Sequence, residues 1–262
     1  MQVYRGMNVG TAKPTVIERR GVPHHLIDVV DPDEEFSVAE FRRLGRQIMA
    51  EATQPVIIVG GSGLHFRALV DPMSFAPTDV ELRMELETVK HEDLVARLGD
   101  ADAEAALHVD LANRRRVIRA VEIMELTGET PSSRAASAEA EDLRNYVPEI
   151  AFRAVGVDPG GLSDPRIERR LDTMRAGGLV EEVSSLHGRM GRAARSAVGY
   201  REIIEHLDGG CSVGEAFDAI GRNTRKLAKR QRTWFQRDPR IRWIPWIEDE
   251  DKRVERVLES LQ

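Results

Sequence analysis

The sequence contains a single cysteine, Cys211, so it can form no intrachain disulfide and no metal site built from several cysteines. It also lacks any apolar run close to the roughly 18 residues that a membrane-spanning helix needs. No apolar signal-peptide segment stands at the start. We therefore expect a cytoplasmic protein with no membrane partner. A chain of 262 residues is long enough to bury a substantial core.

The charge balance argues against indiscriminate binding to nucleic acid, because the formal net charge is −6. The basic residues are nevertheless clustered. One cluster comprises Arg114, Arg115, Arg116 and Arg119, and a second lies between residues 222 and 232. A globally acidic protein with local basic faces suits a defined polyanion that is held in one orientation. A solvated basic helix face is the plain alternative for each cluster.

The first third of the chain has an α/β pattern. Residues 25–30 predict a short strand, and Ser37 with Glu40 forms a capping box for a helix that runs to about residue 52. The continuous apolar run at residues 55–59 predicts a strand that is buried on both faces. Strand, helix and strand in this order imply a parallel sheet.

Two glycine-containing stretches could hold a ligand. Residues 60–63, Gly-Gly-Ser-Gly, directly follow the apolar run and precede a predicted helix at 64–70. Ligands bind at the carboxyl ends of parallel strands, although a tight turn without a ligand explains the same pattern. Residues 10–14 follow a predicted strand end at 2–4 and combine a glycine with Thr11 and Lys13, which suit a phosphate-binding loop. A surface turn closed by proline is the alternative there.

The middle of the chain differs in character from both ends. From residue 78 to about 148 the sequence predicts charged amphipathic helices, and residues 71–77 predict a linker. Residues 132–142, rich in Ala, Ser and Glu, are expected to be mobile. The pattern then returns to strands and longer helices: a strand at 151–157, a helix with its N-cap at Asp164 that ends at Gly177, a helix of about six turns capped by Ser212 and Glu215, a strand at 241–244, and a closing helix around 254–261.

Several short motifs resemble those of the tRNA dimethylallyltransferases (tRNA isopentenyltransferases). They occur in the same order as in that family and cover essentially the whole chain. They are Gln2-Val3-Tyr4 with Gly6 and residues 10–14, then residues 60–64, Arg115 to Glu122, residues 178–183, residues 197–202 and Thr224 to Phe235. Ser62 stands where the family usually has Thr, and His65 replaces its usual Tyr. The resemblance implies transfer of a dimethylallyl group from dimethylallyl diphosphate to N6 of adenine 37, beside the anticodon of certain tRNAs.

The resemblance also implies a fold. We expect an α/β protein with a parallel sheet core like that of the phosphate-loop NTPases, whose N-terminal βαβ portion is missing from this chain, and a helical insertion domain. The core would comprise residues 1–76 and 149–262, and residues 77–148 would form the tRNA-binding insertion. The family's phosphate loop and its catalytic Asp would precede Met1, so no catalytic residue and no metal ligand is assigned. Mg²⁺ and nucleotide (ATP) binding are implied by the family, although the phosphate-loop ligand for Mg²⁺ is absent here.

Site residues are carried over position by position. The resemblance assigns contact with the tRNA anticodon loop to Met1, Gln2, Ser62, Arg83, Arg115, Arg116, Val117, Ile118 and Arg119. The chemistry of their side chains makes Thr11, Lys13, Arg201, Arg225, Lys229 and Arg230 candidates for binding diphosphate or tRNA phosphates, because ammonium, guanidinium and hydroxyl groups donate to phosphate oxygens.

Three interpretations of the chain follow. The first is a truncated or mis-started copy of a tRNA dimethylallyltransferase, whose activity as this polypeptide is doubtful. The second is a tRNA-binding remnant without transferase activity. The third is a relative among the phosphate-loop small-molecule kinases, which the arginine motifs of residues 115–122 and 224–235 argue against, because a kinase needs no tRNA clamp. We favour the first and expect a monomer.

Overall fold

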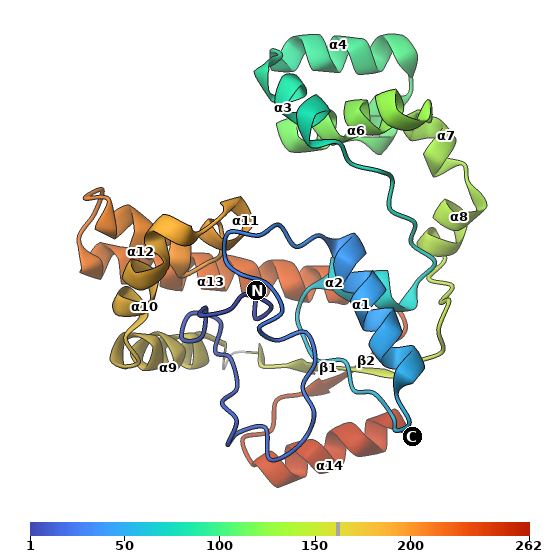
Figure 1. Cartoon of the computed structure of the whole chain (residues 1–262). Helices are drawn as coiled ribbons and strands as arrows, with labels where there is room; N and C mark the ends of the chain where they lie inside the picture. Colours follow the sequence, from blue (N-terminus) through green and yellow to red (C-terminus); the bar gives the residue numbers. More distant parts are fainter. Residues whose placement is uncertain (161–162) are drawn as a thin grey trace. The chain divides into compact units, whose positions relative to one another are not determined.

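The computed structural model describes residues 1–160 and 163–262, which form two compact units (Figure 1). Unit 1 comprises residues 1–69 and 152–262, and unit 2 comprises residues 70–151. The predicted insertion at 77–148 lies within unit 2. No helix in the described ranges is long and apolar enough to cross a bilayer.

Unit 1 is mainly helical, and local sequence signals set where its helices begin. Ser37 accepts a hydrogen bond from the Glu40 amide at the start of α1, and Ser212 and Glu215 form the reciprocal capping box of α13. The helices are α1 (Val38–Glu51), α2 (Gly63–Val70), α9 (Ser163–Ala176), α10 (Leu179–Leu186), α11 (Arg192–Arg195), α12 (Tyr200–Leu207), α13 (Val213–Phe235) and α14 (Glu250–Leu261).

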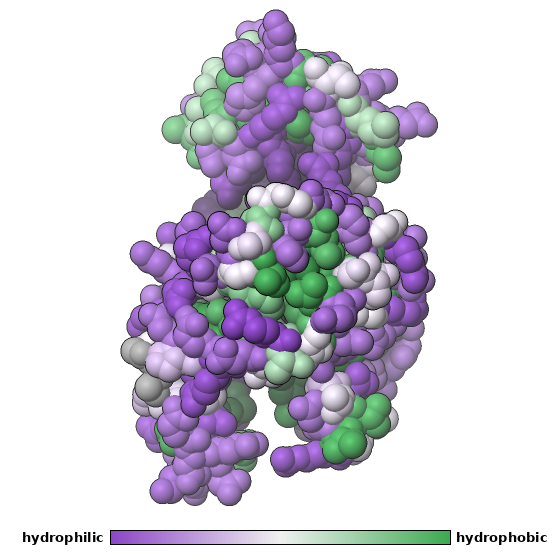
Figure 2. All heavy atoms as spheres, turned by 90° about the vertical axis from the view of Figure 1, so that its left-hand side faces the viewer, coloured by the Kyte–Doolittle hydropathy of each residue, from purple (hydrophilic) through white to green (hydrophobic). Residues whose placement is uncertain are grey.

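The core of unit 1 lies among α9, α10, α12 and α13, and it includes the opening segment. Tyr4 and Met7 are buried in the same cluster as Leu171, Val183 and Phe217. Burying an aliphatic or aromatic side chain contributes about 1.5–3 kcal/mol. The opening segment is therefore anchored by its own side chains. Figure 2 shows one face on which hydrophilic residues predominate around a central group of apolar ones in unit 1.

The sheet of unit 1 is small. Strands β1 (Ala154–Asp158) and β2 (Ile241–Pro245) pair in parallel, with Ala154 opposite Ile241. Both strands were predicted from the sequence. The only other pairing in the described part of the chain is an isolated parallel bridge between Tyr4 and Val30. The fold is thus α/β, but its core is built from helices rather than around a broad parallel sheet.

Two strand predictions are wrong in this structure. Residues 55–59 are in no strand, and the side chains of Ile57 and Val59 are 85% and 88% exposed. Residues 25–30 are likewise irregular except for the bridge at Val30. A strand needs a neighbour that takes its backbone N–H and C=O groups. No strand of the described residues lies beside residues 55–59, so their β-branched composition alone does not make a strand.

Unit 2 is a bundle of short helices with its own core. Leu86, Leu94, Leu98, Val117 and Val121 are buried together. The helices are α3 (Val80–Thr88), α4 (His91–Ala101), α5 (Ala105–His108), α6 (Arg114–Thr127), α7 (Pro131–Ala135) and α8 (Ala138–Arg144).

The stretch at 132–142, which we expected to be mobile, is ordered as α7 and most of α8. Thr130 and Ser137 cap these helices by accepting backbone hydrogen bonds. The Ser132 hydroxyl also donates to the carboxylate of Asp102, at 2.7 Å. Hydroxyl side chains in and beside this stretch therefore cap its helices, and the Ser132 hydroxyl attaches it to Asp102.

Candidate functional site

The predicted phosphate-binding groups of the opening segment face the protein. The Thr11 hydroxyl donates to the Met7 carbonyl at 2.6 Å. The Lys13 ammonium donates to the Tyr4 carbonyl at 2.8 Å and forms an ion pair with Asp28 at 2.5 Å, and its side chain is only 4% exposed. Both groups hold the loop together in this structure, and their contact with phosphate stays a prediction.

The same loop does bind an anion, although one that sequence reasoning missed. The Glu182 carboxylate on α10 accepts hydrogen bonds from the backbone amides of Asn8, at 2.8 Å, and Val9, at 2.7 Å. The motif at residues 178–183 contained this residue, but nothing local pointed to a partner far away in the sequence.

Three residues predicted to contact RNA, Met1, Gln2 and Ser62, belong to unit 1. The Gln2 side-chain amide donates to the carbonyls of Thr11 and Ala12, at 3.1 and 3.2 Å. The Ser62 hydroxyl lies 2.7 Å from His65 Nδ1. Burial lowers the pKa of His65, and the positive charge of the Met1 amino group lowers that pKa further. The Met1 amino group thus lies close enough to His65, in the helix that follows the Ser62 turn, to affect its titration.

This glycine turn packs against the end of α13. Gln231 donates to the Gly61 carbonyl at 2.8 Å. A Cβ on Gly63 would lie 2.1 Å from the Trp234 ring, so only glycine fits there without a shift. Tertiary contacts thereby join the motif at 60–64 to the motif at 224–235.

The cations of α13 differ in what they contact. Arg225 forms ion pairs with Asp164, at 3.1 Å, and with Glu168, both on α9. Lys229 and Arg230 are exposed and form no ion pair with any residue in the described ranges. Arg225 therefore ties two helices together, whereas Lys229 and Arg230 present charge to solvent.

Arg201 lies at the start of α12, where it both forms an ion pair and remains exposed to solvent. It pairs with the buried Glu202 at 2.6 Å, yet its side chain is 56% exposed. Desolvation would raise the pKa of Glu202, but hydrogen bonds from the Gly199 amide, Asn223 and Arg201 lower it overall. The carboxylate therefore stays ionised and holds the Arg201 guanidinium beside α13.

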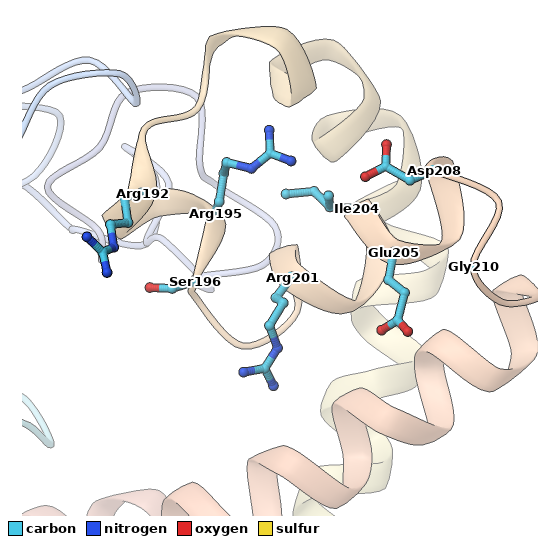
Figure 3. Close-up of a pocket in the computed structure, with 8 residues that line it drawn as sticks. All are labelled: Arg192, Arg195, Ser196, Arg201, Ile204, Glu205, Asp208 and Gly210. Atoms are coloured by element: carbon cyan, nitrogen blue, oxygen red, sulfur yellow. The ribbon is translucent and has the colours of Figure 1, made fainter. Parts of the chain in front are cut away.

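An open depression of about 710 Å³ lies on this part of unit 1 (Figure 3). Arg192, Arg195 and Ser196 line one side, Glu205 and Asp208 line the other, and Arg201 and Ile204 also contribute. Cations and carboxylates both face it. Arg201 thus borders a concave surface, as does Arg225, another predicted phosphate ligand, in a smaller depression of about 250 Å³.

In unit 2, two arginines predicted to bind tRNA instead hold a buried carboxylate. Glu122 is 0% exposed and accepts from Arg83 and Arg119, each at 2.7 Å. Arg119 also donates to the carbonyls of Ala76 and Pro77, at 2.7 and 2.8 Å. These contacts fasten α6 to α3 and to the segment before it. Arg83 and Arg119 therefore have a structural role here.

The remaining residues of the predicted tRNA signature divide by helix face. Val117 is 0% exposed and Ile118 is 6% exposed, both in the core of unit 2. Their side chains pack inside unit 2, and contact of these two residues with RNA stays a prediction. Arg115 and Arg116 lie on the exposed face, where Arg116 makes one ion pair with Asp110, at 3.5 Å. Alternation of buried and exposed positions around one helix explains the division.

The described residues include no group of three or more His, Cys, Asp or Glu side chains that could hold a metal ion. Binding of Mg²⁺ stays an implication of the resemblance, and we assign no residue to it.

Comparison with known proteins decides the family. The model of the IPP transferase family matches residues 2–238. The chain belongs to the IPP transferase family. This confirms the resemblance inferred from the motifs and the prediction of a prenyl-transferring enzyme, and it gives no support to the kinase alternative.

Curated IPP transferase relatives match over most of their length. A tRNA dimethylallyltransferase of Bifidobacterium longum is 42% identical over 251 residues, which cover 93% of this chain and 74% of the relative. A tRNA dimethylallyltransferase of Moorella thermoacetica is 42% identical over an alignment of 273 residues, gaps included, which covers 96% of this chain and 81% of the relative.

Two crystal structures of IPP transferases are similar to this chain. The tRNA isopentenylpyrophosphate transferase of Bacillus halodurans gives a TM-score of 0.68 at 35% identity, covering 99% of this chain and 85% of that one. The Staphylococcus epidermidis protein gives 0.65 at 29% identity, covering 99% and 88%. These matches support the α/β fold, but they do not confirm a phosphate-loop core or a missing N-terminal portion.

Proposed function

We propose that this chain acts in the transfer of a dimethylallyl group from dimethylallyl diphosphate to N6 of adenine 37 in tRNA. The main observation in support of this proposal is that several of the family's motifs, which are separate in the sequence, meet in unit 1. Gly10 of the opening segment lies against the Tyr200 ring at the start of α12. Asn223 of α13 donates to Glu202 of α12, and Gln231 near the end of α13 donates to Gly61 of the turn at 60–63. A cytosolic substrate also fits the predicted cytoplasmic location.

The reaction forms a bond between N6 and C1 of the dimethylallyl group. The C1–O bond breaks, its electron pair leaves on the diphosphate, and N6 loses one proton. Negative charge therefore develops on the leaving group, and positioned cations stabilise it. Arg201, Lys229 and Arg230 are the predicted phosphate ligands whose charge reaches solvent, so we assign this role to them.

Contacts with RNA are assigned in each unit by itself. On α6 the exposed Arg115 and Arg116 are suited to backbone phosphates, which fix position rather than sequence. In unit 1, Met1, Gln2 and Ser62 are suited to the anticodon loop. Adenine 37 must leave its stack to expose N6, and single-stranded loops allow this at low cost.

The test uses an anticodon stem–loop RNA with adenine at position 37 and labelled dimethylallyl diphosphate. We expect the chain to bind the RNA, measured by fluorescence anisotropy, and to transfer label to it. Arg115→Ala and Arg116→Ala should each make the fall of log affinity with log salt less steep, by about 0.7 for each single-strand phosphate that the variant no longer neutralises. Lys229→Ala and Arg230→Ala, which change the groups assigned to the diphosphate, should lower the transfer of label. Lys252→Ala removes an exposed charge on α14 and is the matched control.

The outcomes separate two functions. Transfer of label supports the proposal. Binding without transfer supports a tRNA-binding protein instead, which remains a candidate because no described residue is assigned as the base that takes the N6 proton. Absence of RNA binding would overturn both.

A further inference from the structure

The opening loop is organised around a carboxylate that comes from another element. Glu182 accepts hydrogen bonds from three successive backbone amides, those of Asn8 at 2.8 Å, Val9 at 2.7 Å and Gly10 at 3.2 Å. Successive amides that converge in this way form an anion-binding concavity. The anion that fills it here belongs to the protein.

The same carboxylate also binds the motif at the start of α12. The Tyr200 hydroxyl donates to Glu182 at 2.6 Å. Burial and this hydrogen bond raise the pKa of Tyr200, so its hydroxyl remains a donor at any physiological pH. An ionised carboxylate has about four acceptor positions, and these four donors use them all.

Packing makes Gly10 part of the same arrangement. A Cβ on Gly10 would lie 2.4 Å from the Tyr200 ring. Because glycine has no side chain, the loop can approach the Tyr200 ring closely at this position, and the hydroxyl of the same tyrosine reaches Glu182. Three family motifs meet at this one carboxylate, and the opening one is more than 170 residues away in the sequence.

We propose that Glu182 is a positioning residue for the RNA-binding surface of unit 1, an inference that rests on the proposed function. Its carboxylate fixes residues 8–10, and the next two carbonyls of the loop, those of Thr11 and Ala12, hold the Gln2 amide. Through Tyr200 it fixes the residue that precedes Arg201 in α12. Glu182 thus sets the positions of Gln2 and Arg201 relative to each other without touching either substrate.

The test compares Glu182→Gln with Glu181→Gln, a neighbour on α10 that is exposed and undergoes the same change of charge. Glutamine keeps the shape but presents an NH₂ group to donors. We expect the amides of residues 8–10 to exchange hydrogen at least about tenfold faster in Glu182→Gln, because they lose a charged acceptor. The affinity for the stem–loop RNA should fall about five- to tenfold at a temperature where the variant is folded.

Tyr200→Phe is the second variant, in case Glu182→Gln fails to fold. It keeps the ring against Gly10 and removes one donor, so exchange and affinity should change in the same direction by a smaller factor. Glu181→Gln should match the wild-type chain in both measurements.

A folded Glu182→Gln variant that keeps amide protection, or loses protection yet binds RNA as the wild type does, would overturn the inference. A purely structural role predicts the second result, with a lower melting temperature alone. A wild-type chain that binds no stem–loop would overturn the proposed function, and the inference with it. The wild-type arm thus distinguishes the two failures.

Discussion

The buried Glu122 of unit 2 allows a sharp test of which contacts hold that unit together. Glu122 accepts four hydrogen bonds, two from Arg83 and one each from Arg119 and the amide of Asp79, and in Glu122→Gln the single amide oxygen can accept about two of them. About two charge-assisted hydrogen bonds disappear, each worth about 1.5–3 kcal/mol. Arg83 and Arg119 are 41% and 32% exposed and can regain water, so we halve the sum to about 2–3 kcal/mol.

A loss of this size is measurable as a shift in melting temperature. For a unit of about 80 residues, 1 kcal/mol corresponds to about 4–8 °C. All three tryptophans lie in unit 1, so tryptophan fluorescence reports on unit 1 while circular dichroism at 222 nm reports on the helices of both units. We expect Glu122→Gln to lower the temperature of a circular dichroism transition and to leave the fluorescence transition in place.

Acid should reproduce the effect in the wild-type chain. Desolvation alone would raise the pKa of Glu122, but hydrogen bonds from Arg83, Arg119 and the Asp79 amide lower it below the ordinary 4.5. A lowered folded-state pKa contributes stability above pH 4.5 that is lost as the pH falls through the folded pKa. The pH dependence of unit 2 below that value should weaken in Glu122→Gln.

The control is Glu129→Gln, because the Glu129 side chain is 56% exposed in its ion pair with Arg134, and exposed pairs contribute little. An unchanged circular dichroism transition in Glu122→Gln, or a shift as small as that of Glu129→Gln, would refute the reasoning that Glu122 fastens α6 in place.

Two further predictions concern unit 1. Gly63→Ala should destabilise it by about 1–3 kcal/mol, because the new Cβ would overlap the Trp234 ring, whereas Gly60→Ala meets nothing within 4 Å; tryptophan-monitored melting compares the two. Replacing Ile57 and Val59 by Lys should change stability by less than about 0.5 kcal/mol, since both side chains are exposed, and should reduce self-association in sedimentation. A loss of several kcal/mol there would show that these residues are buried in solution.

Local signals in the sequence predicted much of this protein. Ser37 and Ser212 begin helices where their capping boxes indicated, and strands form at 154–158 and 241–245. Caps and apolar periodicity act within a few residues, so they can be interpreted without knowing the fold. The ordered motifs predicted the family for the same reason, because each is a short stretch.

Tertiary structure decided which polar groups face solvent and which face the protein. Arg119 and Arg115 are equally basic in the sequence, but Arg119 binds the buried Glu122 while Arg115 lies on the exposed face of α6. Asn8 and Glu182 are 174 residues apart, and only packing of the opening segment against α10 brings them together. The apolar run at 55–59 shows the same dependence, since a strand forms only where another strand accepts its backbone hydrogen bonds.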